Sequence, residues 1–230
     1  MTLIDIPPTY QVLHGDALEL LRQVPDASIH AVITDPPYGV DFQSQMTSPQ
    51  RFKKIANDKR PFIWWLHDAY RVTEEGGALL CFCDWKTEDV FKMAIETAGF
   101  TIKSQVIWHR DWHGMGDLKA AFGPDHDVVW FAVKGKFAFP GKRPKSVLSV
   151  RRTAPELIQH PNEKPFDLMK QLVESVTAPG QIVLDPFCGS GSTGEACAAL
   201  NRRFIGFDLD DAYVQLSQER IRGRLSGDTQ

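Results

Sequence analysis

The stretch Gln181–Asp210, QIVLDPFCGSGSTGEACAALNRRFIGFDLD, decides the fold. An apolar strand candidate, Ile182–Leu184, runs into the turn Gly189–Gly194, which fits the pattern GxGxxG. A helix candidate, Thr193–Leu200, and a second strand candidate, Arg203–Phe207, follow. A strand, a glycine-rich turn and a helix in this order are typical of a nucleotide-binding α/β fold.

The rest of the chain continues the alternation of strands and helices. Apolar runs predict strands at Gln11–His14, Ile29–Thr34, Ala78–Cys83, Thr101–His109 and Val128–Val133. Helical periodicity predicts helices at Ala17–Gln23, Trp64–Thr73, Glu88–Ala98, Pro165–Ser175 and Ala212–Arg220. Gly76-Gly77 is interpreted as the stop between a helix and a strand. The pattern predicts an α/β fold with a largely parallel sheet.

The composition is that of an ordinary globular protein. The chain has 230 residues, of which 43% are hydrophobic and 24% charged, so we expect a single domain over residues 1–230. No apolar run is long enough for a membrane span, and the N-terminus lacks the pattern of a signal peptide. We therefore expect a cytoplasmic protein. Its four cysteines form no CxxC pair, which favours buried thiols and no metal.

The glycine-rich turn predicts a cofactor that contains a nucleoside. Glycines let the backbone approach a ligand closely, and Asp208 at the end of the next strand is suited to ribose hydroxyls. The turn alone does not separate a dinucleotide from another adenosine cofactor. Asp185 would repel a pyrophosphate but would attract an ammonium or sulfonium group, as in S-adenosylmethionine. Phe187 could supply an apolar wall.

A second motif, Asp35-Pro36-Pro37-Tyr38, follows the strand Ile29–Thr34. Ligand sites of open α/β sheets lie at such strand ends. The two prolines remove two N–H donors, which leaves the Asp35 carboxylate and the local carbonyl groups as acceptors beside the Tyr38 ring. This combination suits an amino group on a planar ring.

The two motifs together resemble those of the DNA amino-methyltransferases. DPPY at 35–38 is similar to the catalytic motif of this family, and DPFCGSG at 185–191 to its cofactor motif. The catalytic motif comes first, as in the beta group. The resemblance implies a Rossmann-like sheet with a circularly permuted motif order, whose antiparallel edge would be formed by Thr101–His109 and Val128–Val133.

The resemblance also implies a set of residues that bind S-adenosylmethionine, which is released as S-adenosylhomocysteine. HGDAL, from His14, resembles the segment whose acid contacts the cofactor adenine, and HPNEKP, from His160, resembles the segment over its methionine end. The implied set is Asp16, Asp35, Lys164, Pro165, Asp185, Phe187, Gly189, Ser190, Gly191, Ser192, Thr193 and Asp208.

The reaction that the resemblance implies is methyl transfer to the amino group of a base flipped out of duplex DNA. Asp35 and the Pro36 carbonyl would accept the amino protons, Pro37 would fix the turn, and Tyr38 would stack on the base. Asp rather than Ser at position 35 resembles the members that methylate adenine N6; cytosine N4 is the alternative. Methylation of RNA or of a protein amide also stays open, although the Asn-Pro-Pro-Tyr pattern of such members is absent.

A basic stretch supports DNA as the partner despite the net charge of −3. Lys134–Arg152 holds seven basic residues and no acidic one: Lys134, Lys136, Lys142, Arg143, Lys145, Arg151 and Arg152. Such a run is commonly a solvated loop, but beside the methyltransferase motifs we interpret it as facing double-stranded DNA. DNA-facing, target-recognition loops are expected at about 41–62, 108–127 and 134–163.

Two further classes fit part of the sequence. An NAD-dependent oxidoreductase explains GxGxxG and Asp208 but not the Asp35 motif. A catalytically silent DNA-binding relative would not need both motifs intact. Beta-group relatives are often dimers, so a homodimer is open, and so are the recognition sequence and a restriction partner.

Overall fold

The computed structural model describes residues 3–39, 60–111, 118–154, 158 and 162–227. Most of the predicted loop at 41–62, and part of each of the two later loops, lies outside these residues. The described strands are β1 (Tyr10–His14), β2 (Ile29–Thr34), β3 (Thr73–Cys83), β4 (Thr101–His109), β5 (His126–Val133), β6 (Val147–Ser149), β7 (Ile182–Asp185) and β8 (Arg203–Asp208). The described helices are α1 (Ala17–Leu21), α2 (Leu66–Val72), α3 (Glu88–Ala98), α4 (Phe166–Val176), α5 (Ser192–Ala199) and α6 (Asp211–Ser226).

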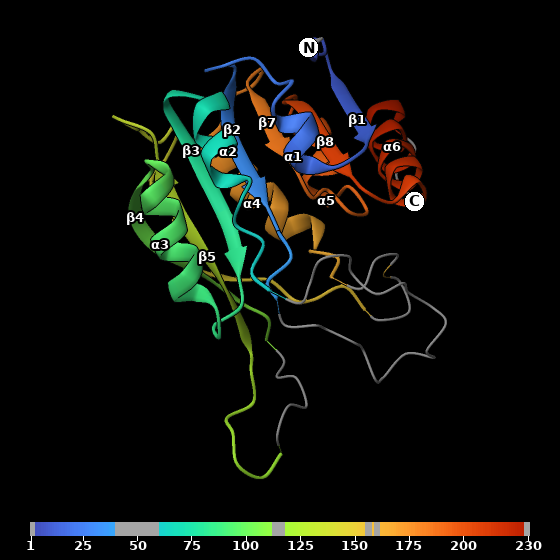
Figure 1. Ribbon diagram of the computed structural model, residues 1–230. Helices are drawn as coiled ribbons and strands as arrows, with labels where there is room; N and C mark the ends of the chain where they lie inside the picture. Colours follow the sequence, from blue (N-terminus) through green and yellow to red (C-terminus); the bar gives the residue numbers. More distant parts are fainter. Residues whose placement is uncertain (1–2, 40–59, 112–117, 155–157, 159–161, 228–230) are drawn as a thin grey trace.

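The strands form one sheet in the order β1-β8-β7-β2-β3-β5-β4-β6, with helices on both faces (Figure 1). Side chains alternate along a strand, so buried strands feed two cores. In β2, Val32 packs with α1, α2 and α3, whereas Ala31 and Ile33 pack with α4, α5 and α6. The predicted mostly parallel α/β sheet is confirmed.

The sheet order creates a crevice between β7 and β2. From β7 the chain crosses through α5 to β8 on one side, and from β2 it crosses through α2 to β3 on the other. Open α/β sheets bind ligands at the carboxyl ends of strands where the direction of progression reverses. Asp35 follows β2 and Asp185 ends β7, so the fold brings the two predicted motifs to this point.

The antiparallel pairing of β4 with β5 is confirmed, but these strands are not the edge of the sheet. Only β5 runs against its neighbours among the paired strands, and β4 returns to the common direction. The outermost strand is β6, which pairs in parallel with β4. β6 was not predicted from the sequence, because it is short and largely exposed. Contacts from β4 hold it in place: Trp108 Nε1 donates a hydrogen bond to the carbonyl of Val150, the residue after β6, at 2.7 Å.

Gly76-Gly77 lie inside β3 and do not end it. Ile29 pairs with Thr73 and Ala31 with Ala78, so an advance of two residues along β2 corresponds to an advance of five residues along β3. Gly76 has a φ of +84°, and a Cβ on Gly77 would lie 2.6 Å from Thr73 Cγ2. The glycines therefore form a bulge where other residues would clash or be strained.

No helix in the described part of the chain is both long and apolar enough to span a membrane.

Candidate active site

A cavity of about 360 Å³ opens at the carboxyl ends of β2 and β7. The whole predicted catalytic motif, Asp35 to Tyr38, lines it. So do ten of the predicted cofactor residues: Asp16, Asp35, Lys164, Asp185, Phe187, Gly189, Ser190, Ser192, Thr193 and Asp208. Pro165 and Gly191 are not in the lining. Pro165 is the N-cap of α4, and Gly191 is the N-cap of α5.

Asp185 is held rigidly beneath the cavity. Its side chain is buried and accepts hydrogen bonds from Thr34 Oγ1 at 2.7 Å, Thr193 Oγ1 at 2.6 Å and the Phe187 amide at 3.2 Å. Burial raises the pKa of Asp185 to about 6, although these hydrogen bonds lower it. Asp185 thus joins the ends of β2 and β7 to the start of α5.

The cofactor turn is shaped by glycine and anchored by Asp208. Gly191 has a φ of +82°, and a Cβ there would lie 2.3 Å from Ser217 Oγ on α6. Asp208 accepts from the amides of Gly189 at 2.9 Å and Asp210 at 2.8 Å. Burial raises the pKa of Asp208, and these amides lower it. The turn therefore packs against α6 and presents Ser192 and Thr193 at a helix N-terminus.

Asp16 caps the short helix α1, because its Oδ1 accepts from the Leu18 amide at 2.8 Å. The Gly15 amide donates to the Asp208 carbonyl at 2.9 Å. These bonds place Asp16 and Asp208, from different ends of the chain, at the same end of the cavity.

Asp35 is ion-paired with Lys164. The Lys164 side chain is almost buried, and its Nζ lies 4.9 Å from the centroid of the Phe82 ring. A residue assigned by resemblance to the cofactor thus contacts the catalytic motif directly. The pair holds an anionic acceptor beside Tyr38, an arrangement that can accept N–H bonds from a planar amine.

Aromatic rings form one wall of the cavity. Phe187 packs edge-on against Phe62 and Trp65, with ring centroids 5.9 Å and 5.5 Å away. Tyr38 meets Phe91 edge-on at 6.4 Å. Trp65 is fully buried, whereas its neighbour Trp64 is 70% exposed. Phe187 therefore lies in the cavity lining, packed against two other aromatic rings.

The sequence analysis did not single out several lining residues: Phe62, Phe82, Met169, Leu209, Asp210 and Tyr213, and also Asn162 and Glu163, which stand in the quoted segment HPNEKP. Asp210 and Tyr213 had a signal, since they follow the predicted ribose residue Asp208 by two and five positions at the end of the same strand. Phe82 and Met169 had none, because their place depends on the sheet order and on how α4 packs.

The seven predicted DNA-binding residues do not form one surface. Lys134 follows the reversed strand β5 and so lies at the end of the sheet opposite the cavity. Its Nζ donates to the carbonyls of Tyr70 and Thr73, both at 2.8 Å. Lys134 therefore fastens the end of β5 to the junction of α2 and β3, and the expectation of one DNA-facing loop is corrected by the direction of β5.

The other basic residues divide in the same way. Lys136 is exposed and lies near Gly76, at the same end of the sheet as Lys134. Lys142, Arg143 and Lys145 line a hollow at the outer edge of β4 and α4. Arg151 and Arg152 follow β6, which runs back toward the cavity side; Arg151 lies 3.8 Å from Asp111.

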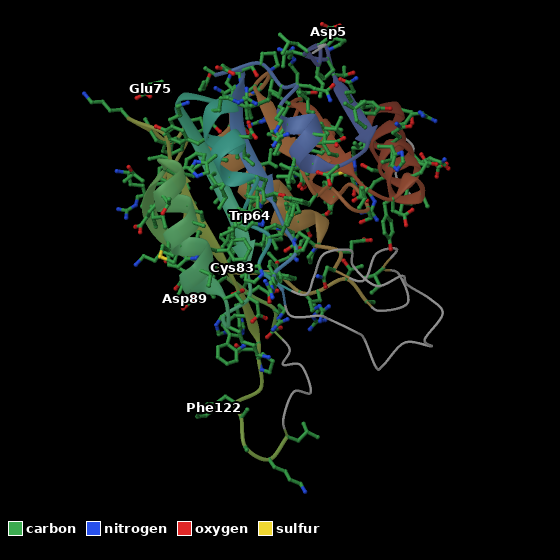
Figure 2. All side chains as sticks on the ribbon, in the orientation of Figure 1. Asp5, Trp64, Glu75, Cys83, Asp89 and Phe122 are labelled. Atoms are coloured by element: carbon green, nitrogen blue, oxygen red, sulfur yellow. The ribbon has the colours of Figure 1, made fainter. Side chains whose placement is uncertain are left out.

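Residues 118–125, which belong to the connection between β4 and β5, project from the cavity side of the sheet (Figure 1). Leu118 and Phe122 in its described part are fully or largely exposed, and Figure 2 shows Phe122 on this projection. Arg110 at its base donates to the Pro124 carbonyl at 2.7 Å and lies 3.5 Å from Asp127.

Within the described residues, no three His, Cys, Asp or Glu side chains are grouped closely enough to hold a metal ion. The four cysteines are buried and free.

Comparison with known proteins gives consistent matches. The N6/N4 methyltransferase family model, described as DNA methylase, matches residues 29–219. Putative methylase YubD of Escherichia coli K12 is 33% identical over 214 residues, 91% of this chain and 88% of YubD. DNA adenine methyltransferase YhdJ of the same organism is 26% identical over 250 residues, 91% of this chain and 82% of YhdJ.

Solved structures share the architecture. The M1.HpyAVI–SAM complex aligns with a TM-score of 0.70 at 27% identity, over 92% of this chain and 100% of that one. The cytosine-N4-specific PvuII DNA methyltransferase aligns with a TM-score of 0.72 at 18% identity, over 98% of this chain and 94% of that one. The second likeness concerns the fold alone.

Proposed function

Because this chain belongs to the DNA methylases of the N6/N4 family, we propose that it methylates the N6 amino group of adenine in double-stranded DNA. The family activity is DNA methylation with S-adenosylmethionine as the methyl donor. The choice of adenine rests on one observation: the motif at the cavity opens with an aspartate, Asp35, as in the adenine-N6 members that it resembles, and not with a serine. We take residues 1–230 as one methyltransferase domain.

The cavity has the chemistry that this cofactor requires. Its volume lies within the usual range for small-molecule sites, roughly 300–1,000 Å³. The lining carries six carboxylates, Asp16, Asp35, Glu163, Asp185, Asp208 and Asp210, and the cation Lys164. Such an excess of carboxylates favours a ligand with ammonium and sulfonium charges, and the aromatic wall offers an apolar surface for an adenosine.

We match the parts of S-adenosylmethionine to the residues at each end of the cavity. Asp208 and Asp16 would hold the ribose and the adenine, since they lie together beside Tyr213. Asp185 would face the methionine ammonium. Lys164 and the start of α5, at Ser192 and Thr193, would face its carboxylate, because free helix N–H groups attract anions.

Asp35 and the Pro36 carbonyl orient the target amine. An aromatic amine is a poor nucleophile because its lone pair is delocalised into the ring. Two acceptors for its N–H bonds would favour a tetrahedral nitrogen and hold its lone pair toward the donor. S-adenosylmethionine supplies an electrophilic methyl group. The new N–C bond would form as the bond from the methyl group to the sulfonium sulfur breaks, with S-adenosylhomocysteine as the leaving group. One amine proton would pass along its hydrogen bond to Asp35 and on to water, and positioning carries much of the rate.

The duplex would lie across the carboxyl ends of the strands. The target base must leave the stack to reach Asp35 and Tyr38, at a cost of a few kcal/mol. Arg151 and Arg152 follow the end of β6 on this side, and Phe122 projects on the same side (Figure 2). We propose them as contacts to DNA, and we do not extend that role to Lys134.

The test is transfer of labelled methyl from S-adenosylmethionine to unmethylated duplex DNA, followed by nucleoside analysis. We expect N6-methyladenine from the native protein and none from Asp35→Ala, with cofactor binding retained. N4-methylcytosine would overturn the choice of base. No label in DNA, together with measurable cofactor binding, would overturn the DNA substrate and direct the assay to RNA and protein amides.

The DNA surface has a matched test. Arg151→Ala should weaken DNA binding and reduce the slope of log K against log salt by about 1, because one phosphate contact is lost. Lys136→Ala removes the same charge at the other end of the sheet and should change neither. Equal effects of the two variants would contradict this orientation of the duplex.

A further inference from the structure

The ion pair between Lys164 and Asp35 depends on how the segment before α4 is held. Glu163, the preceding residue, has a buried side chain with two partners. Its Oε1 accepts from Arg220 Nη2 at 2.9 Å, and its Oε2 accepts from Ser190 Oγ at 3.1 Å. Glu163 thus ties the segment that carries Lys164 to the cofactor turn and to α6.

Arg220 is the centre of this arrangement. From α6, it donates to Glu163, to Ser190 Oγ at 3.2 Å from Nη1, and lies 3.7 Å from Glu195 on α5. Its side chain is only 16% exposed. The one guanidinium therefore contacts three different segments around the cavity.

A second arginine completes the charge balance. Arg224, one helical turn further along α6, pairs with Glu195 at 2.5 Å and stacks over the Phe166 ring at 4.3 Å from its centroid. Two arginines thus oppose Glu163 and Glu195. A paired, hydrogen-bonded set of charges is tolerated in a partly buried site, whereas loss of one member leaves its partner uncompensated.

We propose that Arg220 is a positioning residue for methyl transfer: by fixing Glu163 against Ser190, it places the adjacent Lys164 on Asp35. This inference rests on the proposed function, because Asp35 is the proposed acceptor of the target amine. Arg220 does not line the cavity, so it acts through Lys164. The same guanidinium contacts the cofactor turn at Ser190 and so couples that turn to the catalytic carboxylate.

The geometry requires arginine rather than any cation. The planar guanidinium presents separate N–H groups to Glu163, Ser190 and Glu195 at once, whereas an ammonium is a single point charge. We therefore expect Arg220→Lys to recover only part of what Arg220→Met loses. On the same helix, Arg222 is exposed, so Arg222→Met is the matched control.

The experiment is a double-mutant cycle between Arg220 and Lys164. Arg220→Met and Glu163→Gln should each lower kcat/KM for DNA methylation by about 100-fold, the effect of a small misplacement in the site. In a Lys164→Met background, the same changes should cost less than about threefold, because the residue they position is gone. Arg222→Met should have no effect in either background.

The same cycle is measured on the binding of S-adenosylhomocysteine without DNA. Each single variant should bind it more weakly than the native chain. The fold-loss in affinity of the double variant should again be smaller than the product of the two single fold-losses. If the native chain transfers no methyl to DNA, the proposed function fails and this second cycle still tests the coupling. The inference is overturned if the double variant's fold-loss equals the product of the single fold-losses in both cycles, or if Arg220→Met and Glu163→Gln behave as Arg222→Met.

Circular dichroism and thermal unfolding identify any variant that does not fold, and Glu163→Gln, which conserves shape, then carries the test.

Discussion

Two aspartates end neighbouring strands of the sheet and have opposite surroundings. Asp185, at the end of β7, is buried and hydrogen-bonded to two threonine hydroxyls and an amide. Asp35, after β2, lies at the cavity and pairs with the side chain of Lys164 from a distant segment. A carboxylate held by fixed partners organises a site, whereas one held by an exchangeable partner remains available to a substrate.

The comparison is tested most strongly by removing each charge in turn. Asp35→Asn should lower kcat for methyl transfer by about 10³-fold, within the range for a positioned acid–base group, with cofactor affinity retained. Asp185→Asn should instead weaken cofactor binding by about 10-fold, because one contact to a charged group is worth roughly 1.5–3 kcal/mol. Steady-state kinetics and calorimetry with S-adenosylhomocysteine separate the two; a loss of kcat alone from Asp185→Asn would contradict the distinction.

A smaller effect is expected on stability. Asp185→Ala leaves the hydroxyls of Thr34 and Thr193 without their acceptor and should lower the free energy of unfolding by about 3 kcal/mol. Urea denaturation measures this loss. The exposed Asp5 serves as control, since Asp5→Ala should change the free energy by less than about 0.5 kcal/mol. Equal stability of the two variants would remove the organising role from Asp185.

The smallest expected effect is on the pH dependence of stability. The pKa of Asp185 is raised from 3.8 to about 6, so the folded protein retains a proton that the unfolded chain releases. The resulting stabilisation is complete below about pH 4 and is lost as pH rises through about 6, by roughly 2–3 kcal/mol. The free energy of unfolding of the native chain, measured from pH 4 to 7, should fall by this amount relative to that of Asp185→Asn. If the two free energies change in parallel with pH, the buried carboxyl keeps its ordinary pKa.

The sequence predicted the centre of the sheet better than its margins. β2 and α3 begin and end where the apolar pattern placed them, because β2 is a short apolar run buried almost throughout and α3 buries one apolar face. The glycine pair in β3 misled the analysis, since a bulge and a chain reversal use the same residue for the same reason. β6 is too short and exposed for any pattern to reveal it.

The same distinction holds in the site. Residues within the two motifs reached the cavity because a local turn fixes them. Phe82 lies at the cavity because of the order of the strands, and Glu163 is held there by Arg220 of α6. No local sequence pattern contains either relation. The basic stretch was misjudged as a unit because charge along a sequence does not reveal that β5 reverses the chain before Lys134.

That reversal also has a use in protein engineering. The segment between β5 and β6 turns at the end of the sheet away from the cavity, and a Cβ on Gly141 would meet no atom within 4 Å. Exposed loop tips of this kind accept inserted domains. Position 141 is therefore a natural place to graft a reporter or a programmable DNA-targeting module, which would extend from the face opposite the methyl-transfer centre and leave the approach of the duplex open.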